Sequence, residues 1–148
     1  RYDVLSENEI RARYAAASEQ YAKLLNIEAN TMSYMVRHLY LPALIDYSGN
    51  LATSIATKRE IGVVGRAEQA LAQQITDGID KICENVGRLE SKNAEARRVK
   101  DCGEQDRLYH DEVIPVMDAL REVVDGMERI CGRDFWPVPS YNKMLFWV

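Results

Sequence analysis

The chain has 148 residues, a length that is typical of one ordinary domain and long enough to bury a hydrophobic core. Hydrophobic residues make up 47% of it and charged residues 28%, which excludes an intrinsically disordered chain. The net charge of −4, without a basic face, argues against nucleic acid as a partner, and no apolar run reaches the ~20 residues of a membrane span.

The first predicted helix covers residues 6–57. Ser6 and Glu9 have the spacing of a capping box, in which each side chain bonds the other residue's backbone amide. Pro42 lies inside the helix and predicts a kink near His38, because proline removes a backbone donor and clashes with the preceding turn. The apolar or small residues that we expect on the buried face recur at spacings of three and four: Ile10, Tyr14, Ala17, Tyr21, Leu24, Thr31, Met35 and Ile45, with Leu25, Met32 and Leu39 widening the face.

Gly62 and Gly65 predict a turn, after which a second helix covers residues 66–90. Its apolar stripe consists of Leu71, Ile75, Ile79, Ile82, Val86 and Leu89. Residues 91–93 (Ser-Lys-Asn) predict the next turn because Ser and Asn are good helix caps. A third helix is expected over residues 94–131, or from about Glu104 if Gly103 breaks it, with a bend at Pro115. Its stripe consists of Val99, Cys102, Tyr109, Val113, Met117, Leu120, Val124, Met127 and Cys131.

The end of the chain predicts an extended segment over residues 133–148. Gly132 resembles a residue that stops a helix, and Pro137 and Pro139 favour an extended backbone. Five of the twelve aromatic residues fall here, so the segment could be a strap over the helices, an interface anchor or part of a ligand pocket. The fold expected is all-α: one domain over residues 1–148, an antiparallel bundle of three long, kinked helices with an extended aromatic strap.

The sequence contains no phosphate-binding loop, zinc-protease motif or nucleophile elbow. Neither His38 nor His110 follows a glutamate at the spacing of a helical di-metal enzyme, so no catalytic, cofactor or metal residue is assigned. Glu28 interrupts the apolar stripe of the first helix. It could pair with Arg121 in the bundle, reach solvent at its edge, or contact something outside the chain.

The two ends of the sequence and its cysteines bear on whether the chain is a fragment and on its cellular compartment. It begins at Arg1 without an initiator methionine and stops at Val148 just after the aromatic tail, which we interpret as a fragment of a longer protein. Cys83, Cys102 and Cys131 are odd in number and lack the spacing of a metal site, so we expect reduced thiols and a cytoplasmic location.

Four segments resemble the C-terminal part of type III glutamine synthetases: residues 26–32 (NIEANTM), 41–45 (LPALI), 109–128 (YHDEVIPVMDALREVVDGME) and 136–146 (WPVPSYNKMLF). Ser140 and Met144 depart mildly from the family's Thr and Leu. The resemblance implies a parent enzyme that joins ammonia to glutamate with ATP and Mg or Mn, as a homo-oligomer. It also implies that the catalytic residues lie in an upstream domain of the same chain.

Two functions are therefore carried forward. The first is a structural C-terminal domain that supports packing and oligomer assembly of a glutamine synthetase, inactive by itself. The second is a freestanding helical module for protein–protein interaction. The residues expected to make contacts are Glu28, Trp136, Pro137, Tyr141, Leu145 and Phe146.

Overall fold

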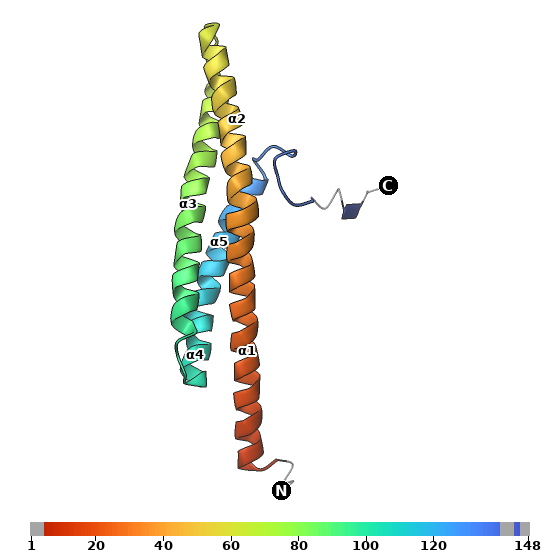
Figure 1. Ribbon diagram of the computed structural model, residues 1–148, viewed down its shortest axis with the longest axis vertical. Helices are drawn as coiled ribbons and strands as arrows, with labels where there is room; N and C mark the ends of the chain where they lie inside the picture. Colours follow the sequence, from red (N-terminus) through yellow and green to blue (C-terminus); the bar gives the residue numbers. More distant parts are fainter. Residues whose placement is uncertain (1–4, 140–143, 146–148) are drawn as a thin grey trace. The chain divides into compact units, whose positions relative to one another are not determined.

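A computed structural model describes residues 5–139 together with Met144 and Leu145 (Figure 1). The described residues form helices and no strands, which confirms the predicted all-α class. Three helical runs follow one another along the chain. The first run is α1 (Glu7–Met35), the π-helical turn η1 (Val36–Tyr40) and α2 (Leu41–Glu60), the second is α3 (Arg66–Ala96), and the third is α4 (Cys102–Leu108), the π-helical turn η2 (Tyr109–Val113) and α5 (Ile114–Glu128).

The predicted capping box opens α1. The Ser6 backbone amide donates to Glu9 Oε2 at 2.7 Å, and the Glu9 amide donates to Ser6 Oγ at 3.3 Å. The bonds from Ser6 stabilise the ionised form of Glu9 and lower the pKa of its carboxyl group. The start of the first helix is therefore determined by local sequence.

A π-helical turn precedes each of the prolines at which we predicted a kink. The Leu41 amide bonds the Val36 carbonyl, and the Ile114 amide bonds the Tyr109 carbonyl, each five residues back. Pro42 and Pro115 come directly after these amides. Proline cannot donate to the fourth residue before it and clashes with that residue's carbonyl, and the wider turn accommodates both effects.

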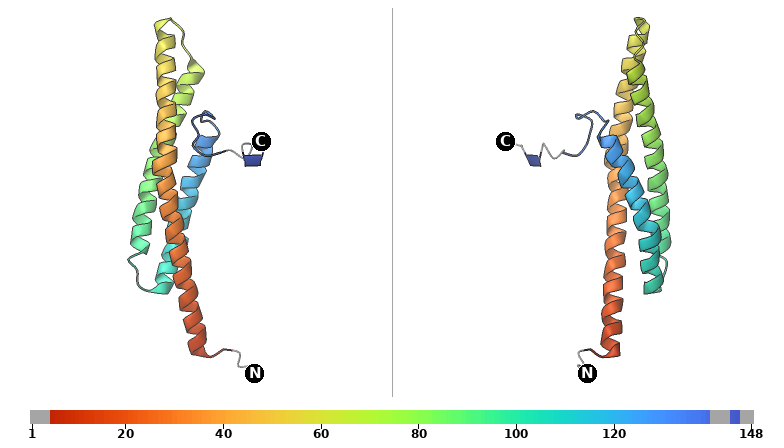
Figure 2. Two further views of the ribbon diagram at one scale, coloured as in Figure 1. Left: turned by 45° about the vertical axis from the view of Figure 1, so that its right-hand side comes forward. Right: turned by 180° about the vertical axis from the view of Figure 1, so that it is seen from behind.

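The first connection is a Schellman motif around Gly62, at the apex of α2 and α3 in both views of Figure 2. The Val63 amide bonds the Lys58 carbonyl at 2.9 Å, the Gly62 amide bonds the Arg59 carbonyl at 3.0 Å, and Gly62 has φ of +79°. Because that backbone conformation is strained for residues with a Cβ atom, glycine is favoured here. The turn predicted at Gly62 is confirmed.

The second connection lies later than residues 91–93, where we predicted it. Helix α3 continues through Ala96, and the third run begins at Cys102 rather than at residue 94. Asp101 caps this start by accepting a hydrogen bond from the Glu104 amide at 2.9 Å. Ser91 and Asn93 can cap helices, but Asn93 is 4% exposed and its amide bonds other helices, so the backbone stays helical.

The chain divides into two compact units. The first comprises the chain up to Ser33 together with Gly87–Asp118, and the second comprises Tyr34–Val86 together with the chain from Ala119 onward. The single domain that we expected stays a prediction. The second and third apolar stripes are largely buried as predicted, most completely at Ile75, Ile82, Val86, Leu89, Tyr109, Val113 and Leu120.

The buried face of α1 includes Leu25, as predicted, but is rotated away from most of the residues that we expected on it. Its buried residues are mostly small: Ser18, Ala22, Leu25, Ala29 and Ser33. The larger residues Ile10, Tyr14 and Leu24 are 54%, 59% and 54% exposed. Ser18 bonds Asp106 of α4, and Ala22 lines the same hollow as Tyr109, so this face is selected by contacts that a pattern of hydrophobicity does not contain.

The third run ends at Glu128, three residues before the predicted end, and Gly132 does not take the left-handed conformation of a helix-stopping glycine. Its role is close packing, since a Cβ atom there would lie 3.0 Å from the Tyr47 ring and 3.2 Å from the Phe135 ring. The Phe135 and Trp136 amides both bond the Gly132 carbonyl, so residues 132–136 form a turn where an extended segment was expected.

Candidate functional site

The most distinctive polar feature of the first unit is a group of four side chains that we call the Asn93 network: Asn26, Asn30, Asn93 and Tyr109. The Asn93 side-chain amide donates to the carbonyl oxygens of Asn26 and Asn30, both at 3.1 Å. Its own oxygen accepts from the Tyr109 hydroxyl at 3.3 Å. Asn93 and Tyr109 are 4% and 1% exposed, so these bonds satisfy groups that water cannot reach.

A second polar contact joins α1 to α4. The buried Ser18 hydroxyl lies 2.6 Å from Asp106 Oδ2 and 3.3 Å from the Cys102 carbonyl oxygen. The other carboxylate oxygen, Asp106 Oδ1, is buried and has no hydrogen-bond partner among the described residues. Burial raises the pKa of Tyr21, and the negative charge of Asp106 raises it further. These contacts fix α1 against α4 by polar groups rather than by large apolar ones.

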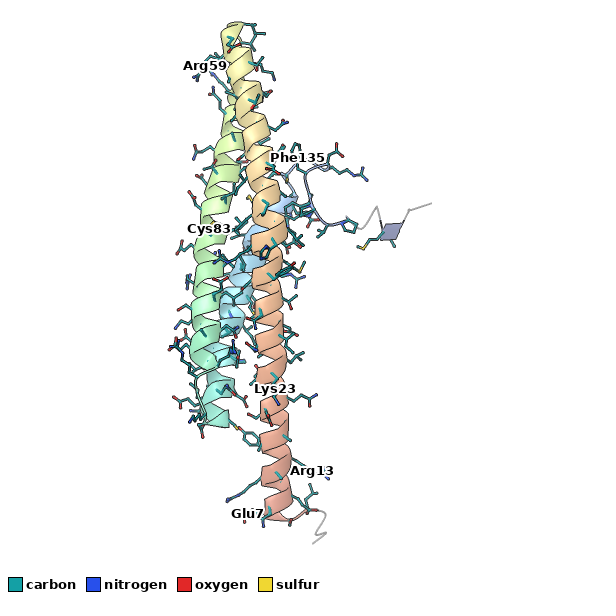
Figure 3. The ribbon with its side chains drawn as sticks, viewed as in Figure 1. Glu7, Arg13, Lys23, Arg59, Cys83 and Phe135 are labelled. Carbon is teal, nitrogen blue, oxygen red and sulfur yellow. The ribbon has the colours of Figure 1, made fainter. Side chains whose placement is uncertain are left out.

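Beside the Asn93 network lies a hollow of about 270 Å³, which we call the α1 hollow. All of its lining residues belong to the first unit. Lys23, which projects from α1 in Figure 3, pairs with Glu19 one turn earlier at 2.6 Å. The hollow is lined by Glu19, Ala22, Lys23, Asn26, Arg97, Gln105 and Tyr109. It therefore combines both signs of charge with two amides and an aromatic ring.

Stability of the first unit should fall at high pH through Tyr109. Burial raises the pKa of its phenol above the ordinary 10.0, and the positive charge of Arg97 opposes this more weakly. As pH rises, the Tyr109 phenol therefore ionises in the unfolded chain before it ionises in the folded one. Its contribution to the free energy of unfolding is complete below pH 10 and is lost as pH rises through the folded pKa. Between pH 7 and about pH 10.5, we expect the free energy of unfolding to fall less in Tyr109→Phe than in the unsubstituted chain.

Urea unfolding of both proteins at the two pH values measures this difference. The pKa values of Tyr21, Tyr40 and Cys131 are also raised, and these groups are common to both proteins, so the comparison isolates Tyr109. An identical pH dependence in the variant would contradict the prediction.

The predicted contact residue Glu28 is exposed and makes no hydrogen bond or ion pair within the part of the chain that the structure describes. Arg121, its suggested partner, instead lies 3.7 Å from Asp125 on its own helix. Glu28 and Arg121 belong to different units, so the expected pair between them stays a prediction.

The predicted contact residues of the tail differ in their surroundings. Trp136 stacks on Tyr40 with ring centroids 5.1 Å apart, and Phe135, labelled in Figure 3, lies 5.1 Å from the Tyr47 ring. Pro137 is exposed and Leu145 is 71% exposed. Tyr141 and Phe146 lie outside the described residues. Trp136 thus packs within the second unit, while Pro137 and Leu145 remain available for other contacts.

Histidines and cysteines make no catalytic arrangement among the residues that the structure describes. No three metal-ligating side chains come together there. His110 lies 2.7 Å from the adjacent Asp111 at the surface, and His38 packs on Tyr34 with ring centroids 4.5 Å apart. All three cysteines are free, and burial raises the pKa of Cys131. None of the described helices is long and apolar enough to cross a membrane.

Sequence reasoning missed the Asn93 network and the α1 hollow. Asn93 was assigned to a turn, and Asn26 was only part of a family-like segment. A usable signal was the position of Asn93 four residues after Leu89, in register with the apolar stripe of α3. A polar residue in such a register indicates a buried polar contact, whose partners only the packing reveals.

Residues 1–59 match a model of the family described as the glutamine synthetase C-terminal domain. This match covers α1, η1 and nearly all of α2. The capping box and the π-helical turn of the first helical run therefore lie within the residues that match this family model.

Nearly the whole chain aligns with three glutamine synthetases. It is 28% identical to that of Butyrivibrio fibrisolvens over 99% of the chain, and 29% identical to the type-3 glutamine synthetase of Dictyostelium discoideum over 97%. A third relative, from Bacteroides fragilis, is 21% identical over 97% of the chain. The chain spans about a fifth of the length of these relatives. The chain is thus similar to the glutamine synthetase C-terminal domain over residues 1–59, and nearly all of it is similar to a part of these glutamine synthetases.

Proposed function

We propose that the chain is the structural C-terminal domain of a glutamine synthetase that joins ammonia to glutamate with ATP and Mg or Mn in the cytoplasm. In this proposal the catalytic and cofactor-binding residues belong to an upstream domain of the same polypeptide. The helical domain packs beside that domain and supports homo-oligomer assembly. The chain by itself forms no glutamine.

The observation that carries the proposal is an apolar surface on α1, consisting of Ile10, Tyr14, Leu24 and Ile27, which we call the α1 stripe. These side chains are 54–60% exposed on a helix whose other face is buried. Exposed apolar groups gathered on one helix are typical of contact surfaces. The proposed occupant is the catalytic part of the same polypeptide, because the relatives are about five times longer than the chain and the family match includes this helix.

The proposal also includes a fold. We infer that the three helical runs form one antiparallel bundle and that residues 133–148 cross it as an aromatic strap. The close approach of Phe135 and Trp136 to Tyr47 and Tyr40 supports the beginning of such a strap. Pro137 and Leu145, being exposed, are the candidates for contacts with another subunit, together with Tyr141, Phe146 and Glu28.

The coding sequence upstream of Arg1 gives the first test. We expect a catalytic domain with glutamate-rich metal-binding motifs in the same reading frame. A start codon within a few residues of Arg1 would instead support the freestanding interaction module.

The second test removes the α1 stripe from the full-length enzyme with Leu24→Ser and Ile27→Ser together. We expect light scattering to show loss of the large assembly, because serine removes the apolar area that would be buried. The matched control is Ile61→Ser with Val64→Ser, which alters two even more exposed apolar residues at the turn between α2 and α3.

In the 148-residue chain alone, both double variants should change the free energy of unfolding by less than about 1 kcal/mol, since all four side chains are exposed. Full assembly of the stripe variant, or an equal loss in both variants, would contradict the role assigned to the α1 stripe. Glutamine formation by the isolated chain would contradict its structural role.

A further inference from the structure

The α1 hollow has two hydrogen-bonding groups that make no hydrogen bond with the residues that the structure describes. The Asn26 side-chain oxygen accepts from both Asn93 and Asn30 at 3.1 Å, which turns the Asn26 amide nitrogen away from these partners. The Gln105 amide nitrogen donates to the Ala96 carbonyl at 3.0 Å, which leaves the Gln105 side-chain oxygen uncommitted. One donor and one acceptor are thus held in fixed orientations on residues that line the hollow.

The charge of the hollow is also incompletely compensated. Lys23 and Glu19 neutralise one another. Arg97 makes no ion pair with any residue that the structure describes, although its charge is felt at the Tyr109 phenol. With Lys23 and Arg97 against Glu19, the lining has a net charge of +1, which favours a ligand with one carboxylate.

We propose that the α1 hollow binds a free amino acid, a small carboxylate that also carries N–H donors. Arg97 would bind the carboxylate, Asn26 would donate to a ligand oxygen, and Gln105 and Glu19 would accept from the ligand's N–H groups. The hollow, with a volume of about 270 Å³, is open to solvent, so a small ligand can reach its polar groups directly. The Asn93 network fixes the amide of Asn26, so this part of the site is formed before the ligand arrives.

The inference concerns residues of this chain alone and does not depend on the proposed assembly role. The probe is glutamine, titrated calorimetrically into the 148-residue chain at constant ionic strength. Propionate, which has the carboxylate without N–H groups, and propylammonium, which has N–H groups without the carboxylate, are titrated in parallel. We expect saturable binding of glutamine, at least about tenfold weaker binding of propionate, and none of propylammonium.

Two neighbouring arginines provide the matched variants. Arg97→Gln removes the cation of the hollow, whereas Arg98→Gln removes an exposed cation that does not line it. Both should fold normally because both side chains are exposed, and circular dichroism checks this. We expect Arg97→Gln to weaken glutamine binding at least about tenfold and Arg98→Gln to leave it unchanged. Absence of saturable binding, equal effects of the two variants, or propionate binding as tight as that of glutamine would overturn the proposal.

Discussion

Asn93→Ala is expected to lower the free energy of unfolding by about 3 kcal/mol. The change removes the bonds from Asn93 to Asn26 and Asn30 and leaves the Tyr109 hydroxyl, which is 1% exposed, without its acceptor. A buried polar group without a partner loses its hydration and gains nothing in return, and the truncation also leaves a cavity. Equilibrium unfolding in urea measures the change.

The control for this prediction is Asn30→Ala, which removes an exposed member of the same network and should cost less than about 1 kcal/mol. Asn93→Leu combined with Tyr109→Phe should be much less harmful than Asn93→Leu alone, because the double variant leaves no phenol hydroxyl unsatisfied. If Asn93→Ala costs no more than Asn30→Ala, the network does not stabilise the first unit as we infer.

Gly78→Ala is expected to leave the second unit no more stable than before, without the gain of about 1 kcal/mol that the higher helix propensity of alanine would give. Gly78 is a buried residue of α3, and a Cβ atom there would overlap Met127 Sδ and lie 2.7 Å from Met127 Cε. Met127 must therefore shift its flexible side chain, and the packing that it loses offsets the gain of about 1 kcal/mol in helix propensity. Thermal and urea unfolding measure the balance.

Gly87→Ala provides the matched control on the same helix. Its new Cβ atom would meet nothing within 4 Å, so only the propensity gain remains and stability should rise by about 0.5–1 kcal/mol. Adding Met127→Ala to Gly78→Ala should cost less than the sum of the two single changes, because the overlap disappears. A stabilising effect of Gly78→Ala as large as that of Gly87→Ala would rule out the close approach.

Elements whose cause is local were predictable from the sequence. The start of α1 follows from a reciprocal pair of bonds between residues three apart, and the turn at Gly62 follows from one backbone conformation that favours glycine. The stripes of α3 and of the third run were also read correctly. The large apolar residues of these helices repeat at the helical period and gather on one face, so no second face could be taken for the buried one.

The errors all concern residues whose partners are distant in the sequence. Asn93 is a good turn residue, but its partners in α1 lie more than sixty positions away and keep it inside a helix. Gly132 was interpreted as a helix stop, whereas the approach of the Tyr47 ring explains the glycine. Which face of α1 is buried depends on contacts with Tyr109 and Asp106. These residues lie far along the chain, so the sequence of α1 itself does not reveal them.

The sequence by itself thus determined the helical class, the capping box, the turn at Gly62, the places where proline disturbs a helix and the resemblance to glutamine synthetases. Each of these depends on backbone propensity, short-range bonds or the order of segments within the chain. Only the tertiary structure decided which face of α1 is buried, that Asn93 joins α1 to the third run, and that Arg97 and Gln105 share a hollow. These depend on the fit of side chains between helices, because size and hydrogen-bond direction have meaning only once the helices are in contact.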